Sequence, residues 1–313
     1  MRTWRRGGVA LCALFLVAIC RCSPYDPAMA AYMRMVEDGV DSKEHGLTAG
    51  LKTTNCSCGW TNKARIVGGK ETLKNEYPLM VGVMRKTEGK IFCGAALVTT
   101  RHVLTAAHCP FEYPDDNLTV ALGQHDQLED VEKSGALLVD VAQSIVHEKF
   151  DVETYLFDIA LLVLERAVEF TQLIGPACLP SRRMHMINEQ VKVLGWGRIQ
   201  TGGPPSTVLL KTNLKIIPIK TCANNYIRPI EVEDPHQFCT YLRKHDSCQG
   251  DSGGPVLWLD PDTNRYTLVA IVSYGKKCGR SSPSLNVDVS YFLDWIQAKI
   301  KETDSSVDTC AKV

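Results

Sequence analysis

The sequence predicts an all-β fold that ends in one α-helix. Short apolar runs, separated by turn residues, occur at 79–84, 95–98, 159–164, 191–194, 208–217, 256–259 and 267–272. Runs of this length and spacing indicate a β-barrel or β-sandwich rather than alternating strands and helices. Near the C-terminus, aromatic and aliphatic residues recur at helical intervals, which predicts an amphipathic helix over residues 290–301.

The composition is that of a globular protein with an unusual number of cysteines. The chain has 313 residues, of which 45% are hydrophobic and 22% are charged, so disordered and fibrous classes are excluded. The formal net charge is zero, and nothing therefore suggests a nucleic-acid partner. Thirteen cysteines indicate an oxidising compartment, where thiols become cross-links.

The N-terminus has the pattern of a secretory signal peptide. Three arginines precede an apolar run from Val9 to Cys20, which is too short to span a bilayer. Cleavage after Cys20 and cleavage after Cys22 both fit this pattern. The second leaves ten cysteines, an even number that can all pair. We expect a signal peptide over residues 1–22, an extracellular chain and no membrane partner.

Residues 23–65 differ in character from the rest of the chain. From 23 to 55 there is no cysteine, and large aliphatic side chains are few, so we expect a poorly ordered pro-segment. Cys56 and Cys58 follow, which are too few cysteines for a disulfide-rich recognition module. The β-pattern begins at Ile66, and residues 66–313 are therefore expected to form the main domain.

Three short strings contain residues suited to nucleophilic catalysis. His108 lies among small residues in LTAAHC, and it adjoins a cysteine that can fix its loop. Asp158 opens the apolar run DIALL, and a buried carboxylate of this kind needs a hydrogen-bonded partner such as an imidazole. Ser252 lies in GDSGGP, where glycines allow tight backbone geometry and direct N–H groups to one point.

These strings, in the order His, Asp, Ser, resemble those of the chymotrypsin- and trypsin-like serine proteases. The resemblance covers Ile66 to Val313. It implies an all-β fold of two six-stranded antiparallel β-barrels with a C-terminal helix. The segment from Cys56 to Ile66 is similar to that of arthropod secreted proteases, including venom proteases.

The resemblance also implies a role for each catalytic residue. Ser252 would be the nucleophile, His108 the general base and then the general acid, and Asp158 would orient the imidazole. The backbone N–H groups of Gly250 and Ser252 would form the oxyanion hole. An isolated serine hydroxyl is a poor nucleophile near neutral pH, so this aligned base is required.

The resemblance extends to an activation site in RIVGG. Cleavage after Arg65 would create an α-amino group on Ile66. By resemblance this ammonium group turns inward and pairs with Asp251, next to the nucleophile. The chain would then be a zymogen, activated by a trypsin-like protease or by itself.

The resemblance further implies a set of disulfides. Cys178 would tether either Cys58 or Cys56. The resemblance gives no partner for the remaining one of these two or for Cys310, and the two are paired only because they are left over. Val191 and Trp258 stand where many relatives have one more bridge. The other implied pairs are Cys93–Cys109, Cys222–Cys239 and Cys248–Cys278.

Primary specificity is expected for Arg or Lys. By resemblance Asp246 lies at the base of the pocket that holds the residue before the cleaved bond, while Gly275 leaves its mouth open and Ser273 to Gly275 pair with the substrate backbone. Ser284 stands where glycine is common and Asn286 where tyrosine is usual. An atypical or smaller substrate residue is therefore the alternative specificity.

Other residues have smaller roles in these expectations. Asn117 and Asn55 match glycosylation sequons. Gln124 replaces an acid that binds calcium in related enzymes, so we expect no metal and no cofactor. Four histidines are expected at the surface, namely His125, His147, His185 and His236.

Two function classes follow from the sequence. The first is an active secreted endopeptidase that acts on protein or peptide substrates and is subject to a serpin-type inhibitor. The second is a non-catalytic homologue that binds partners through the same scaffold. The presence of all three triad residues favours the enzyme.

Overall fold

The computed structural model of the chain describes residues 46, 48–62, 71–111, 113, 115–198, 202–242, 250–275 and 282–313. All of these residues lie in the unit that spans residues 39–313. The expected signal peptide lies outside the described residues. Within the described ranges, no helix combines the length and the apolar character that crossing a bilayer requires.

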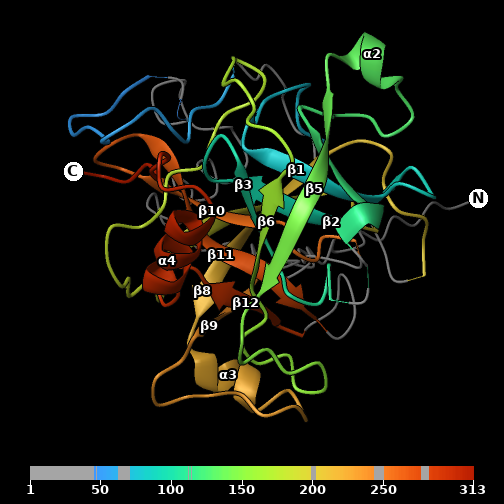
Figure 1. Ribbon diagram of the computed structural model, residues 1–313. Helices are drawn as coiled ribbons and strands as arrows, with labels where there is room; N and C mark the ends of the chain where they lie inside the picture. Colours follow the sequence, from blue (N-terminus) through green and yellow to red (C-terminus); the bar gives the residue numbers. More distant parts are fainter. Residues whose placement is uncertain are drawn as a thin grey trace, which may run out of the picture. The chain divides into compact units, whose positions relative to one another are not determined.

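The first six strands form a closed antiparallel barrel in the order β1-β2-β3-β6-β5-β4 (Figure 1). The strand β6 is entirely aliphatic and buried, which is why its sequence is apolar without alternation. The strands are β1 (Met80–Arg85), β2 (Lys90–Leu97), β3 (His102–Thr105), β4 (Leu118–Leu122), β5 (Leu137–Val146) and β6 (Ala160–Leu164).

The other six strands form a second closed antiparallel barrel in the order β10-β11-β12-β9-β8-β7. The predicted all-β class with two six-stranded barrels is thereby confirmed. The apolar runs anticipated seven of the twelve strands and missed β3, β4, β5, β9 and β12. The strands of this barrel are β7 (Gln190–Gly195), β8 (Leu210–Ile217), β9 (Gln237–Tyr241), β10 (Pro255–Asp260), β11 (Arg265–Tyr274) and β12 (Ser284–Asp288).

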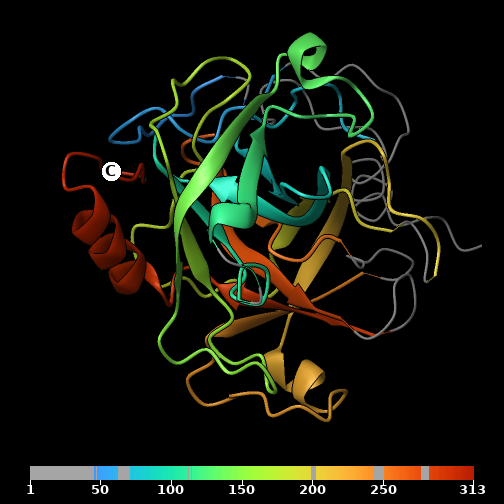
Figure 2. The ribbon, with the colours of Figure 1, turned by 45° about the vertical axis from the view of Figure 1, so that its right-hand side comes forward.

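Helices are short and lie outside the barrels (Figure 2). The C-terminal helix α4 spans Leu293–Thr303, so the helix expected over 290–301 is present but begins three residues later and ends two residues later. It buries Leu293, Ile296 and Ile300 against the body. Oγ1 of Thr303, the last residue of the helix, is hydrogen-bonded to Nε2 of the buried His102 at 2.8 Å. This bond ties the helix to β3. The remaining helical segments are η1 (Asp115–Asn117), α2 (Val131–Ser134) and α3 (Ile219–Ala223).

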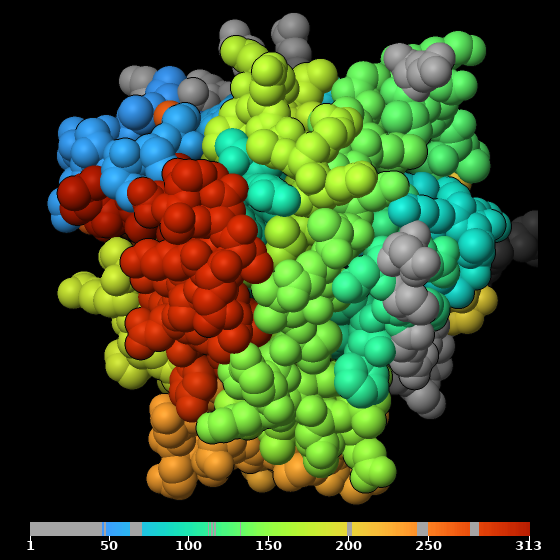
Figure 3. Space-filling model, viewed as in Figure 1, coloured from blue at the N-terminus to red at the C-terminus, as the bar shows by residue number. Residues whose placement is uncertain are grey.

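The described part of the expected pro-segment packs against the body of the protein. The backbone N–H of Gly50 donates to the carbonyl of Thr263 at 2.8 Å, and the N–H of Gly59 donates to the carbonyl of Pro176 at 2.8 Å. Figure 3 shows residues of this segment, in blue, against the red C-terminal residues. The prediction of poor order is therefore wrong for residues 48–55. This stretch has few large apolar side chains, and backbone hydrogen bonds to the body hold it in place.

Candidate active site

His108 lies in the loop that follows β3, and two constraints fix this loop. A disulfide joins Cys109 to Cys93 of β2. The backbone N–H of Phe111 donates to the carbonyl of Ala107 at 3.1 Å, which closes a tight turn around the histidine. The imidazole is largely shielded, with 17% of the side chain exposed.

Asp158 is fully buried and pairs with His108. Its carboxylate accepts two bonds from that residue, one from the backbone N–H at 2.9 Å and one at 2.9 Å from Nδ1. The hydroxyl of Ser273 donates to the same carboxylate. Burial without these donors would be costly, so the three bonds explain how a carboxylate is kept in the core. The sequence predicted Ser273 in the specificity pocket and did not indicate this bond.

Ser252 lies in a glycine-rich loop that leads into β10. Gly250 and Gly253 have φ angles of 99° and 76°, a region that favours glycine. The carbonyl of Ser252 accepts a 2.7 Å bond from the N–H of Gly94 in β2, so the first barrel holds the loop of the second. A side chain on Gly253 would meet Oγ1 of Thr105 at 2.2 Å, which shows how closely the two barrels are packed here.

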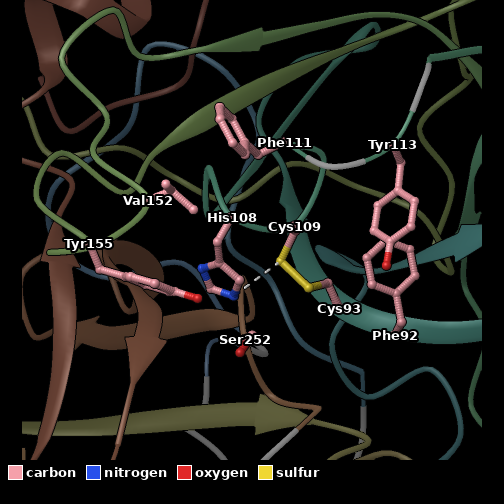
Figure 4. A pocket seen from close by; sticks show the side chains of 9 residues that line it. All are labelled: Phe92, Cys93, His108, Cys109, Phe111, Tyr113, Val152, Tyr155 and Ser252. Carbon is pink, nitrogen blue, oxygen red and sulfur yellow. Dashed lines mark hydrogen bonds between the residues drawn. A yellow bond between two sulfur atoms is a disulfide. The ribbon is translucent and has the colours of Figure 1, made fainter.

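A single pocket of about 280 Å³ brings the histidine and the serine together (Figure 4). Tyr155 and Val152 lie on one side of His108, and the Cys93–Cys109 disulfide with its aromatic neighbours lies on the other. Nε2 of His108 lies 3.8 Å from Sγ of Cys109. The open side of the imidazole thus carries Nε2, while Nδ1 is bonded to the buried Asp158.

Asp251 adjoins Ser252 and is held by the glycines of another loop. Its Oδ1 accepts a 2.8 Å bond from the backbone N–H of Gly197. A Cβ on Gly195 or Gly197 would lie 2.0 or 2.5 Å from Oδ1, so only glycine fits at these two positions. Its expected partner Ile66, with the cleavage residue Arg65, lies outside the described residues.

Part of the expected specificity pocket is described. Ser284 is buried and its Oγ faces Gly275, where a Cβ would come within 3.1 Å of it. Asn286 is also buried, and its side-chain amide donates to Oγ1 of Thr240 at 2.9 Å. Asp246 lies outside the described residues, so the base of the pocket stays a prediction.

Four disulfides are described, and two of them tether the expected pro-segment. Cys58 is bonded to Cys178, and Cys56 is bonded to Cys310. The sequence left the partner of Cys178 open between these two cysteines. The other described bridges are Cys93–Cys109 and Cys222–Cys239, while Cys248 and Cys278 lie outside the described residues.

The prediction of surface histidines is wrong at His236 and partly wrong at His147 and at His125, whose side chain is only 11% exposed. His236 is 4% exposed and stacks on Phe157, with ring centres 4.5 Å apart. His147 also stacks on Phe157, with ring centres 5.2 Å apart, and is half-buried. Burial lowers the pKa of His236 to about 4 and also lowers the pKa of His147. A lone histidine carries no apolar pattern, so nothing in the sequence placed these rings in the interior.

Among the described residues, one close group of three side chains is of the kinds that can bind a metal ion, but its chemistry does not suit a metal site. Cys93, His108 and Cys109 lie together, but the two sulfurs form a disulfide and cannot act as thiolate ligands. The side-chain amide of Gln124 donates to the backbone carbonyl of Asp126. This hydrogen bond gives the Gln124 side chain a protein partner.

The two sequons differ in their surroundings. Asn117 ends the short η1 segment and is partly exposed. Asn55 contacts the C-terminal tail, since its amide donates to the carbonyl of Thr309 at 3.2 Å and accepts from the N–H of Ala311 at 2.7 Å. A glycan on Asn55 would be attached to Nδ2, the atom that donates to Thr309, while the bond that Oδ1 accepts could remain. Glycosylation at either asparagine stays a prediction.

Comparison with known proteins agrees with this geometry. The family model described as Trypsin matches residues 66–296. Venom serine protease 34 of Apis mellifera is 38% identical over 261 residues, which are 82% of this chain and 63% of that protein, so the chain spans less than two thirds of this relative. Venom serine protease of Polistes dominula is 35% identical over 260 residues, 81% of this chain and 92% of that protein. Proclotting enzyme of Tachypleus tridentatus is 36% identical over 254 residues, 77% of this chain and 68% of that protein.

The family match covers both barrels and all three candidate triad residues. Ser252 and Asp158 each bond to the opposite barrel, through Gly94 and Ser273, and His108 and Ser252 line one pocket. The resemblance inferred from the sequence is confirmed, and the chain belongs to the trypsin family of serine proteases.

Proposed function

We propose that the chain is a secreted serine endopeptidase, made as a zymogen, whose catalytic residues are Ser252, His108 and Asp158. The observation that carries this proposal is the pairing of Nδ1 of His108 with a fully buried carboxylate, with Nε2 left on the open pocket that Ser252 lines. This is the arrangement that a serine nucleophile needs from its general base.

The proposed reaction proceeds in two steps. Oγ of Ser252 attacks the carbonyl carbon of the peptide bond while Nε2 of His108 accepts its proton. The same histidine then donates this proton to the leaving amine, and water releases the acyl group by the reverse route. Asp158 holds the proton of the neutral imidazole on Nδ1 and stabilises the imidazolium ion. The Ser273 hydroxyl donates to the same carboxylate and helps to hold it in place. Gly250 and Ser252 would supply the two N–H donors for the oxyanion.

Activation and primary specificity complete the proposal. Cleavage after Arg65 would free the amino group of Ile66 to pair with Asp251, whose neighbouring glycines leave no room for other side chains. Asp246 would select Arg or Lys, with Ser284 facing Gly275 at the pocket wall. The substrates would be proteins or peptides. The venom and clotting enzymes among the relatives support secretion and a place in a proteolytic cascade.

Labelling with a fluorophosphonate tests the proposal directly. The chain is expressed whole, cleaved after Arg65 and exposed to the probe, and Ser252→Ala serves as the control. We expect labelling of the cleaved wild type only, and hydrolysis of chromogenic peptides that end in Arg or Lys rather than Phe or Ala. A cleaved, folded chain that neither reacts nor hydrolyses any peptide would make it a binding homologue instead.

A further inference from the structure

A cation and two tyrosines form a cluster beside the candidate triad. The guanidinium carbon of Arg228 lies 4.2 Å from the ring centre of Tyr155 and 5.1 Å from that of Tyr274. The two tyrosine rings are 5.5 Å apart and meet edge to face. Both rings attract the cation through their π-faces, so the arginine is held between a loop of the first barrel and the end of β11.

This cationic cluster adjoins the groups that would act on the substrate. Tyr155 packs against the imidazole of His108, with ring centres 5.1 Å apart, and lines the same pocket as Ser252. Figure 4 shows it on the side of His108 opposite the Cys93–Cys109 disulfide. Tyr274 directly follows Ser273, whose hydroxyl is bonded to Asp158.

The positive charge of Arg228 has no acidic partner among the described residues. Three acidic residues follow Arg228 within six positions, and two of them have other partners. Glu231 accepts the backbone N–H of Glu233 at 3.0 Å, and Asp234 lies 3.8 Å from Arg183. Stacking uses the flat face of a guanidinium group, while its N–H donors lie at the edge of the plane. Arg228 is partly exposed, so this edge can meet a carboxylate that arrives with the substrate.

The distance between the cation and the triad sets which substrate residue it can meet. One ring contact of 5.1 Å and one cation–π contact of 4.2 Å separate His108 from the guanidinium carbon. An extended peptide advances about 3.3 Å per residue. If the substrate pairs with the Ser273 to Gly275 edge, the cation is within reach of a side chain roughly two to four residues before the cleaved bond.

We propose that Arg228, held by Tyr155 and Tyr274, selects substrates with an acidic side chain two to four residues before the cleaved bond. This inference rests on the proposed function. It adds an anionic requirement to the expected basic residue at the cleavage position, so the preferred substrate segment carries both charges.

A peptide library tests this selection on the cleaved, full-length enzyme. The residue before the cleaved bond is fixed as Arg, and the three preceding positions are varied. We expect Asp or Glu to raise kcat/KM by about three- to tenfold at one of these positions, the range of a partly exposed ion pair. The gain should shrink as ionic strength rises.

Substitutions at Arg228 test whether this residue causes the preference for acidic side chains. Arg228→Ala should remove it while cleavage of peptides with neutral residues is retained, and Arg228→Glu should reverse it toward Lys or Arg. Arg182→Ala removes another exposed arginine and should leave the preference unchanged. An acidic preference that survives Arg228→Ala, or none in the wild type, would overturn the inference. Loss of all turnover and of fluorophosphonate labelling in the wild type would instead refute the proposed function.

Discussion

Phe157 has a backbone conformation that a bulky residue rarely adopts, with φ at 55°. It immediately precedes Asp158, so this strained turn helps to aim the buried carboxylate at His108. The ring of His236 stacks on Phe157, and its Nε2 accepts the backbone N–H of Phe157 at 3.4 Å. Only a neutral imidazole can accept this bond, because a protonated one has no free lone pair.

Acid should therefore destabilise the protein through His236. Burial lowers its pKa from 6.5 to about 4, against the opposing effect of Glu231 and with smaller effects of Arg183 and His147. Below pH 6.5 the unfolded chain binds this proton and the folded chain does not, so the free energy of unfolding falls as the pH drops toward 4. The contribution of His236 is about 2–3 kcal/mol.

Urea unfolding at pH 7 and at pH 4.5 measures this loss. His236→Phe keeps an aromatic ring in the stack and should reduce the difference between the two pH values, because one titrating group is gone. The buried His102, whose pKa burial also lowers to about 4, should retain part of the difference. His185→Gln, at an exposed position, should behave as the wild type. An unchanged difference in His236→Phe would contradict this assignment.

At the scale of elements, the serine loop depends on how closely it approaches the first barrel. Gly253 faces Thr105 of β3 and the carbonyl of Gly94 in β2, at 2.2 and 2.4 Å from the position of a Cβ. Gly202 has almost the same φ, 75° against 76°, but has nothing within 4 Å. The two glycines therefore separate the effect of backbone conformation from that of packing.

Alanine at these two glycines should have very different effects. Gly202→Ala should cost about 1 kcal/mol of stability, the penalty of a left-handed backbone, and leave catalysis intact. Gly253→Ala adds a collision with backbone and should cost about 3 kcal/mol while displacing Ser252. Thermal unfolding and fluorophosphonate labelling of the cleaved variants measure both effects. Equal losses in the two variants would show that packing at Gly253 is unimportant.

The sequence predicted the parts whose residues carry a local pattern. The strings around His108, Asp158 and Ser252 each combine one reactive residue with small or apolar neighbours, so they could be located without a structure. The strand β12 could not, because Ser284, Asn286 and Asp288 are buried polar residues that leave no apolar run. The contact of Arg228 with Tyr155 joins loops of different barrels, and no local pattern connects residues so far apart in sequence.

At the scale of the whole molecule, two disulfides fasten the pro-segment to the body. Cys58–Cys178 joins it near the connection between the barrels, and Cys56–Cys310 joins it to the tail after α4. Both cysteines of the pro-segment precede Arg65, so the segment should stay attached after activation. The backbone hydrogen bonds of residues 48–62 add non-covalent contact over the same surface.

Either disulfide alone should be enough to retain the segment. We expect the cleaved chain to run as one species in non-reducing denaturing electrophoresis and as two after reduction. Replacing Cys56 and Cys310 by serine, or Cys58 and Cys178 by serine, should still give one species without reductant. Only replacement of all four should give two. Release from one of the paired variants would show that its remaining bridge does not form.

Cys56 and Cys310, 254 positions apart, make the molecule between them a covalent ring. The bond after Arg65 lies within that ring, but the Cys58–Cys178 bridge divides the ring into two smaller loops. The proposed cut opens only the loop that runs from Cys58 through Ile66 to Cys178. The other loop, from Cys178 to Cys310 and back through Cys56 to Cys58, stays covalently closed after the cut.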